Sequence, residues 1–331
     1  MFKNYVKVAL RTLLKNKAYS AINIIGLALG LMVSIIVFLY VKDETSYEKH
    51  VHDYERIYRF GIKANMMGMN IDAPVSCSPM ANSLRTEFPE VITAARIRPI
   101  DQEILLAYEQ EKKIYVEEGT RADSLFFSVF NYEFIHGDPS TALKEDNGMV
   151  LTAETAQKFF GSENPMGKVI RYDDRSDYIV RGVVKEPKGK SHFHFNFFIG
   201  NNAIRNQWSS NNNYTYVKLE EGTDPDAFLA KAAETFMGYM GPEVEQFIQM
   251  PIEDFMAEGN SFEYEMHPIE SIHLHSAREW EIEQNGDATY VYAFIAIAFL
   301  VLLIAGINFM NLSTARSSKR AKEVGIRKVS G

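Results

Sequence analysis

The chain has 331 residues, of which 46% are hydrophobic and 24% charged, and these averages alone would describe a soluble protein. The charges are unevenly distributed, because residues 1–41 carry five basic groups and no acid, and residues 316–331 carry six basic groups against one glutamate. The remainder holds 24 basic and 42 acidic residues, which argues against nucleic acid as its partner. The single cysteine, Cys77, excludes an intrachain disulfide, and we expect it to be a small buried residue.

Residues 2–15 have the pattern of a basic amphipathic helix. Apolar residues recur at helical spacing, and basic residues occupy every fourth position on the other side. Such a helix suits the headgroup region of an anionic bilayer, so we expect residues 1–17 to lie on the cytoplasmic surface of membrane lipid. An ordinary helix packed on protein is the alternative.

Residues 18–41 form an uncharged apolar run that is long enough to cross a bilayer as a helix. A cleaved signal peptide is the alternative, but its apolar part is shorter, and no small-x-small cleavage site follows Val41. Gly26 and Gly30 form a G-x-x-x-G pair, which predicts close packing against another helix. Asn23 is a polar group that requires a partner inside a helix bundle.

Residues 288–315 form a second uncharged apolar run, which we also expect to cross the membrane. A buried helix of a soluble domain is the alternative, but such helices carry a polar face. Lys and Arg concentrate on the cytoplasmic side of membrane helices. The basic flanks at 1–17 and 316–331 therefore predict that both ends lie in the cytoplasm and that residues 42–287 lie outside it.

Residues 42–287 alternate between strand and helix patterns, which predicts an α+β domain with a mixed sheet. The expected fold is therefore two transmembrane α-helices flanking a mixed α/β extracytoplasmic domain. Helices are expected from Ser78-Pro79 to 88, from Thr152 to 160 with Gly161 at the end, and for about four turns after Asp224-Pro225. Strands are expected at 94–108, 113–116, 149–151, 169–172, 178–184, 192–199, 214–219 and 262–274.

Two histidine pairs are candidate metal ligands. His192 with His194, and His273 with His275, would each lie on one face of a strand. Neither cysteine nor a helical His-Glu-x-x-His motif accompanies them, so solvated strand histidines explain the pattern better and we expect no metal site.

Carboxylates and a glycine-containing loop are the remaining candidates for chemistry. Glu279, Glu281 and Glu283 fit a solvated acidic collar better than a catalytic carboxylate pair. The segment 161–168 approaches a phosphate-binding loop, but Val169 replaces the hydroxyl residue and a strand follows instead of a helix. We therefore expect no catalytic residue and no cofactor in this chain.

Residues 316–331 carry features that a plain basic anchor does not need. Glu323 is a lone acid among basic residues, Val324 and Ile326 are apolar, and Gly325 permits a close approach or a helix end. These features predict a short helix that docks on another protein at the cytoplasmic face. The expected contact residues are Glu323, Val324, Gly325, Ile326, Arg327 and Lys328.

Three stretches resemble the MacB/FtsX-like ABC transporter permease family. Residues 2–31 resemble its N-terminal amphipathic helix and first transmembrane helix, and residues 151–170 resemble a recurring segment of its periplasmic core. Residues 290–331 resemble the junction of the periplasmic core with the permease domain. The sequence EVGIRK, at 323–328, is the most specific of these motifs.

The resemblance implies a function and a set of partners. Each permease unit of that family has four membrane helices, which transmit motion from a separate cytoplasmic ATPase to a periplasmic domain between the first two. It implies an inner-membrane location, a permease dimer or pseudo-dimer, export or extraction of a substrate, and an ATPase contact at Glu323 to Lys328. ATP hydrolysis would belong to the partner, so this chain is not expected to be an enzyme. Because only two spans are present, we expect a longer permease of which this is the N-terminal part.

A membrane-anchored sensor with an extracytoplasmic ligand-binding domain is the alternative function. Further apolar spans after residue 331 would favour the permease, whereas a soluble catalytic module there would favour the sensor.

Overall fold

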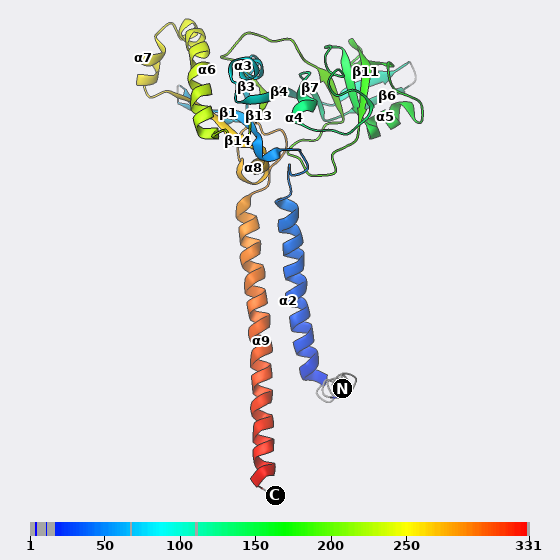
Figure 1. Cartoon of the computed structure of the whole chain (residues 1–331), viewed down its shortest axis with the longest axis vertical. Coiled ribbons are helices and arrows are strands. Elements are labelled where there is room, and N and C mark those ends of the chain that lie inside the picture. The colour runs from blue at the N-terminus through cyan, green and yellow to red at the C-terminus, as the bar shows by residue number, and fades with distance from the viewer. Residues whose placement is uncertain (1–3, 5–10, 12–16, 67, 110–111, 330–331) are drawn as a thin grey trace. The chain divides into compact units, whose positions relative to one another are not determined.

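The computed structural model describes residues 4, 11, 17–66, 68–109 and 112–329 (Figure 1). The chain forms two compact units: a helical unit made of Met1–Thr45 and Asp287–Gly331, and a core domain, Ser46–Gly286. The helix predicted over 2–15 lies almost wholly outside the described residues, so its place on the membrane surface stays a prediction.

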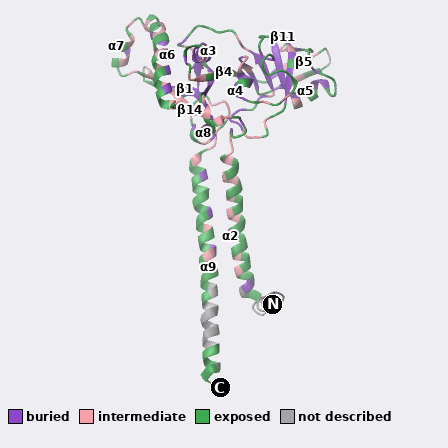
Figure 2. Cartoon of the chain, in the orientation of Figure 1, coloured by how far each residue is buried: buried purple, intermediate pink, exposed green. Residues whose placement is uncertain are grey.

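Two long α-helices make up the described part of the helical unit: α2, Lys17–Glu44, and α9, Ala288–Val329. Each contains a stretch long and apolar enough to cross a membrane, Ser20–Glu44 and Ala288–Asn311. Most large apolar side chains on these stretches are exposed, as the green colour along both helices in Figure 2 shows. Exposed apolar surface of this extent is costly in water and favourable in hydrocarbon.

Helix α2 packs against α9 where small residues let the backbones approach. A Cβ atom added to Gly30 would come within 2.8 Å of the Cβ of Ala305, and one added to Gly26 would lie 3.4 Å from the amide nitrogen of Asn308. These contacts fit the close packing expected of the G-x-x-x-G pair. The Oδ1 atom of Asn23 is buried and has no hydrogen-bond partner within the described part of the chain.

The core domain contains the remaining described helices and all of the described strands. Its helical elements are η1 (Tyr54–Arg56), α3 (Met80–Glu87), α4 (Phe126–Val129), α5 (Ala153–Phe160), α6 (Pro225–Ile248), α7 (Ile252–Ala257) and α8 (Ile269–His275). Its strands are β1 (Ile57–Met66), β2 (Met69–Ala73), β3 (Ser76–Cys77), β4 (Val91–Ile100), β5 (Ile104–Tyr108), β6 (Lys112–Val116), β7 (Gly119–Ala122), β8 (Phe134–Gly137), β9 (Gly148–Thr152), β10 (Val169–Tyr172), β11 (Ser176–Val184), β12 (Phe197–Gly200), β13 (Asn211–Leu219) and β14 (Ser261–Pro268).

The strands connect into one mixed sheet, which confirms the predicted α+β class. Its main path runs β14-β1-β13-β4-β7-β12-β9-β11-β10-β5-β6, and β2, β3 and β8 pair with β1, β13 and β11 beside this path. The pairs β7–β12 and β9–β11 are parallel, whereas the other pairs of the main path are antiparallel.

Side chains alternate between the two faces of the sheet, and the two faces are covered differently. One face carries a single core that includes Phe126 of α4, Ile272 of α8 and Tyr216 of β13. The other face carries two separate cores. One includes Leu84 of α3 with α6, and the second includes Phe159 of α5. The sheet is therefore left without a helical cover between these two cores.

Local signals predicted several elements correctly. Strand β9 and helix α5 follow one another as expected, and the hydroxyl of Thr152 accepts a hydrogen bond from the backbone N–H of Thr155. Gly161 ends the helix with a φ of 59°, a conformation that glycine adopts without steric cost. Strands β10 and β11 form where they were predicted, and they pair in antiparallel fashion.

Five of the predicted element assignments or boundaries were wrong. The strand expected at 94–108 breaks after Ile100, because β4 pairs with β7 whereas β5 pairs with β6 and β10. Residues 269–275 form α8 instead of a strand, since Ile269, Ile272 and His273 are buried at helical spacing. Helix α6 is longer than the predicted four turns.

The predicted cap at Ser78 and the strand at 192–199 were the other two errors. Pro79 occupies the N-cap position of α3, and the hydroxyl of Ser78 bonds to Arg96 instead. Strand β12 begins only at Phe197. The preceding residues have no partner strand because side-chain carboxylates bind the backbone N–H groups of His192 and His194.

We predict that Gly30→Leu separates α2 from α9, because the new side chain would occupy the position of Ala305. Cysteines at Tyr40 and Phe294, whose ring centroids lie 5.3 Å apart, should form a disulfide in membranes of the parent chain and severalfold less in the variant. Gly306→Leu is the control, because a Cβ atom at Gly306 would meet open space. An unchanged cross-linking yield in Gly30→Leu would contradict the packing role.

Candidate functional site

The chain enters the core domain through residues 46–53, which we call the first connection. Glu48 lies there with its side chain fully buried and its backbone at φ 61°. Its N–H donates to the carbonyl of Lys190 over 2.9 Å. Its carboxylate accepts hydrogen bonds from the backbone N–H of His192, at 2.6 Å, and lies 2.8 Å from the Nδ1 atom of that residue.

A buried polar chain continues from Glu48 through His192 to the sheet. The Nε2 atom of His192 lies 2.6 Å from the hydroxyl of Tyr216 on β13. Burial alone would raise the pKa of Glu48, but the charge and hydrogen bonds of His192, with Ser191, outweigh it and hold the pKa below its ordinary value. Burial raises the pKa of Tyr216. The carboxylate of Glu48 therefore stays charged inside the core, where it binds both the backbone N–H and the imidazole Nδ1 of His192.

Two further contacts hold the first connection in place. The ring of Tyr47 stacks on His273 of α8, with centroids 3.4 Å apart. A Cβ atom at Gly189 would overlap the ring of His50, so only glycine allows this close approach.

The chain leaves the core domain through residues 276–286, which we call the second connection. Arg59 of β1 donates two hydrogen bonds of 2.7 Å to the two carboxylate oxygens of Glu281. The side chains of Arg59 and Glu281 are only 1% and 10% exposed, and the hydroxyl of Ser276 also bonds to Glu281. A bidentate pair of this kind fixes both the distance and the orientation of its partners.

Weaker contacts extend the hold on the second connection. The Nδ1 atom of His194 lies 3.0 Å from the carboxylate of Glu283, and Arg278 pairs with Asp72 over 3.0 Å. The hydroxyl of Tyr214 donates to the carbonyl of Trp280 over 2.6 Å. Both connections are therefore bound to the core domain at several points.

The two buried pairs lie next to each other in the sheet. Arg59 and Tyr216 are directly opposite in the antiparallel β1–β13 register. Such residues have Cβ atoms about 5 Å apart. His192 and His194, two residues apart, then bind Glu48 of the first connection and Glu283 of the second. We call this arrangement of residues 189–196 with Arg59 and Tyr216 the clamp.

The histidine pairs do not lie on strands, contrary to the prediction from the sequence. His192 and His194 lie on an irregular segment, and His273 and His275 lie on α8, so neither pair shares a strand face. Among the described residues no group of three or more His, Cys, Asp and Glu side chains is arranged to hold a metal ion.

The predicted solvated acidic collar was correct only in part: Glu279 is exposed and Glu283 is partly exposed while it binds His194, but Glu281 is buried against Arg59. The prediction that Cys77 is buried is confirmed, and burial raises the pKa of its thiol to about 12. Sequence reasoning missed Glu48 and Arg59. For Arg59 a signal exists, since it interrupts an apolar strand between Ile57 and Phe60.

The predicted cytoplasmic contact residues lie on α9, which continues to Val329 as a single helix instead of a separate short one. Val324 and Ile326 are 60% and 58% exposed. The side chains of Glu323 and Arg327 lie outside the described residues.

Residues 20–235 of the chain match the model of the MacB-like periplasmic core domain family. The chain belongs to this family. The match includes Glu48, Arg59 and His192 and ends before the second connection.

One of three similar solved structures shares the fold of the core. A domain of a permease-like protein from Porphyromonas gingivalis is 18% identical, with a TM-score of 0.55 over 66% of this chain and 91% of that chain. The periplasmic region of MacB from Actinobacillus actinomycetemcomitans is 13% identical, with a TM-score of 0.42 over 68% and 96%. The extracellular domain of the noncanonic ABC-type transporter YknZ from Gram-positive bacteria is 14% identical, with a TM-score of 0.40 over 63% and 98%. No curated protein matches this chain.

We predict that Arg59→Met destabilises the core domain by about 3–5 kcal/mol, because it leaves Glu281 buried without its partner. The double variant Arg59→Met/Glu281→Gln should recover part of this loss. Urea unfolding followed by the fluorescence of Trp208 and Trp280 measures both.

The control is the exposed pair of Lys185 with Glu133, for which Lys185→Met should cost no more than about 1 kcal/mol. Strictly additive losses in the Arg59 and Glu281 variants would contradict a coupled buried pair.

We predict a pH-dependent contribution from His194. Its hydrogen bond to Glu283 raises the pKa of His194 above 6.5, against the opposing effect of burial. A group whose pKa is higher in the folded state stabilises that state fully at pH values below its unfolded-state pKa. This contribution is lost as the pH rises through the folded-state pKa. The stability difference between the parent chain and His194→Asn should therefore be largest below about pH 6.5 and shrink as the pH rises above that value. The exposed His136→Asn variant serves as the control, and a difference that grows with pH would contradict this assignment.

Proposed function

We propose that this chain is a permease subunit of an ABC transporter. In this proposal a separate cytoplasmic ATPase drives a conformational change of the core domain that exports or extracts a substrate. The family membership of the core domain supports this proposal. The observation that carries it is the continuity of α9, which passes through the apolar stretch and on to Val329 without a break.

A continuous helix can transmit a displacement along its axis. At 1.5 Å per residue, the 42 residues of α9 extend about 63 Å, of which about 27 Å lie beyond Asn311 at the end of the apolar stretch. This length is sufficient to cross a bilayer and to present a further helical segment to a partner on the other side.

The clamp is the part of the core domain that would receive this displacement. Its buried pairs bind the residues that directly precede α9 and those that directly follow α2 in the chain. Buried charge pairs resist separation because each group would be left without a partner in a medium of low polarity. A pull on either helix would therefore act on β1, β13 and the segment 189–196 together.

The membrane arrangement in this proposal follows the distribution of charge. Helices α2 and α9 both cross the inner membrane and contact its lipid. The core domain lies in the periplasm, and the basic ends lie in the cytoplasm. A permease dimer or pseudo-dimer provides further helices for the polar Asn23 and Asn308 side chains. ATP hydrolysis belongs to the partner, and this chain has no enzymatic role of its own.

The ATPase contact is placed on the last turns of α9. The apolar side chains of Val324 and Ile326 are largely exposed there, beyond the stretch that would lie in hydrocarbon. An apolar patch within a basic segment fits a protein surface better than it fits water or lipid headgroups.

We predict that Ile326→Asp and Glu323→Lys each weaken the binding of the ATPase to the full-length permease about tenfold or more. A tenfold loss of affinity corresponds to about 1.4 kcal/mol of binding free energy. ATP turnover and co-purification in membranes measure the effect. Lys319→Gln changes one charge of the same segment without touching the apolar patch and should behave like the parent. If both contact variants also match the parent, the tail is only an anchor.

A further inference from the structure

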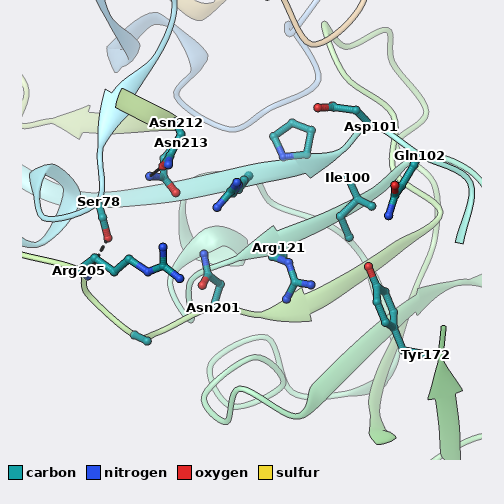
Figure 3. A pocket seen from close by; sticks show the side chains of 13 residues that line it. Ser78, Ile100, Asp101, Gln102, Arg121, Tyr172, Asn201, Arg205, Asn212 and Asn213 are labelled. Carbon is teal, nitrogen blue, oxygen red and sulfur yellow. Dashed lines mark hydrogen bonds between the residues drawn. The ribbon is translucent and has the colours of Figure 1, made fainter. Parts of the chain in front are cut away.

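A polar cleft of about 620 Å³ opens on the core domain where the sheet has no helical cover (Figure 3). It lies between the core that includes α3 and the core that includes α5. Its lining comes from β4, β7, β10, β13 and the loop after β12. The lining residues used below are Ser78, Arg98, Asp101, Arg121, Tyr172 and Arg205.

Two of the arginines form an unfavourable pair in the sheet. Arg98 of β4 and Arg121 of β7 are directly opposite in antiparallel register, so their side chains emerge on the same face from Cβ atoms about 5 Å apart. Like charges in this position repel each other and destabilise the sheet. Among the described residues no carboxylate forms an ion pair with Arg98, Arg121 or the third arginine, Arg205.

The wall that carries Arg205 is rigidly held by a fourth arginine. Arg96 is only 3% exposed and donates hydrogen bonds to Ser78 and to the carbonyls of Asn201, at 3.0 Å, and Ala203, at 2.7 Å. The backbone N–H of Arg205 donates to the hydroxyl of Ser78 over 3.1 Å, as the dashed line in Figure 3 shows. The loop and the sheet are therefore fixed relative to each other before any ligand binds.

An aromatic ring completes the opposite wall. The guanidinium of Arg121 lies 5.8 Å from the centre of the Tyr172 ring, within cation–π distance, and also bonds to the Tyr172 side chain, so this residue holds the guanidinium in position. Asp101 is an exposed carboxylate in the same lining. Among the described residues it forms no ion pair with Arg98, Arg121 or Arg205, so the cleft lining keeps three positive charges against this one negative charge.

We propose that this cleft binds an oxyanion group, a carboxylate or a phosphate, of a small ligand. Guanidinium groups match these anions with paired N–H donors, and the three arginines of the lining attract anions into the cleft. A bound anion would also relieve the repulsion between Arg98 and Arg121. This site lies within the core domain, and its existence does not depend on the proposed ATPase.

The test is calorimetric titration of the full chain in detergent at low salt. Three probes are used: inorganic phosphate, citrate and water-soluble dihexanoyl phosphatidic acid. Binding with a Kd below about 1 mM is expected for at least one probe. Binding of phosphate or citrate indicates a free anion as the ligand class, whereas binding of the lipid probe alone indicates a lipid headgroup. The absence of binding by all three would overturn the proposal.

The variants Arg98→Gln and Arg121→Gln should each weaken binding about tenfold or more, corresponding to the loss of one charged hydrogen-bonding partner. Arg175→Gln, in the exposed turn between β10 and β11, removes the same charge outside the cleft and should bind as the parent does.

A structural role for the arginines makes the opposite prediction about stability. If Arg98 and Arg121 serve only the fold, their replacement should lower the Tm of the ligand-free protein. In our account removal of the repulsion leaves Tm unchanged or raises it. Unchanged affinity in both cleft variants, or a lowered Tm in both, would overturn the proposal.

Discussion

A charge that is removed from water must be paired, and this constraint fixes both connections to the core domain. Glu48 and Arg59 are both buried, and each is bound by a partner that approaches from a distant part of the chain. Glu48 belongs to the first connection itself, whereas Arg59 belongs to the sheet and binds Glu281 of the second connection. Because Arg59 and Tyr216 are neighbours across β1 and β13, the two bonds share one small region of the sheet.

In the proposed function this arrangement would let the core domain receive motion from the helices. Well-packed hydrophobic side chains alone would also hold a loop to a domain, and often more stably than buried charges do. Charged pairs add direction, since a bidentate guanidinium–carboxylate contact tolerates little change in orientation. A domain that must follow two helices benefits from directional contacts at both points of attachment. The same sheet has an uncovered face elsewhere, where Arg98 and Arg121 form no ion pair with a carboxylate among the described residues. The two proposals therefore assign a mechanical role to one set of its polar groups and ligand binding to another.

Local patterns were sufficient for the parts of the fold that depend on neighbours in sequence. The two apolar runs predicted α2 and α9, and Thr152 with Gly161 predicted both ends of α5. The strand predicted from His192 was wrong because the N–H groups of His192 and His194 bond to carboxylates 144 and 89 positions away. No local sequence pattern reveals such contacts. Its alternating phenylalanines were misleading, since Phe193 and Phe197 pack into different cores.

The candidate site was predictable only in fragments. The histidines and glutamates were considered as candidate metal or catalytic residues and then assigned to solvated surfaces, because their actual pairing is set by tertiary contacts. Helix α8 was missed although Pro268 and Glu270 provide a start signal, because the apolar residues after them also suit a strand. The arginines of the cleft are separated by more than 20 positions in the sequence, so only the β4–β7 register brings Arg98 and Arg121 together.

Hydrogen–deuterium exchange in the full permease with its ATPase tests the central claim most directly. The N–H groups of Glu48 and His192 take part in the hydrogen bonds that hold the first connection, so their exchange rates report whether the clamp stays closed. The account predicts that both amides stay as protected as those of β1 and β13, with and without a non-hydrolysable ATP analogue. Exchange at the rate of an open loop in either state would show that the connections move independently of the core domain, and would contradict it.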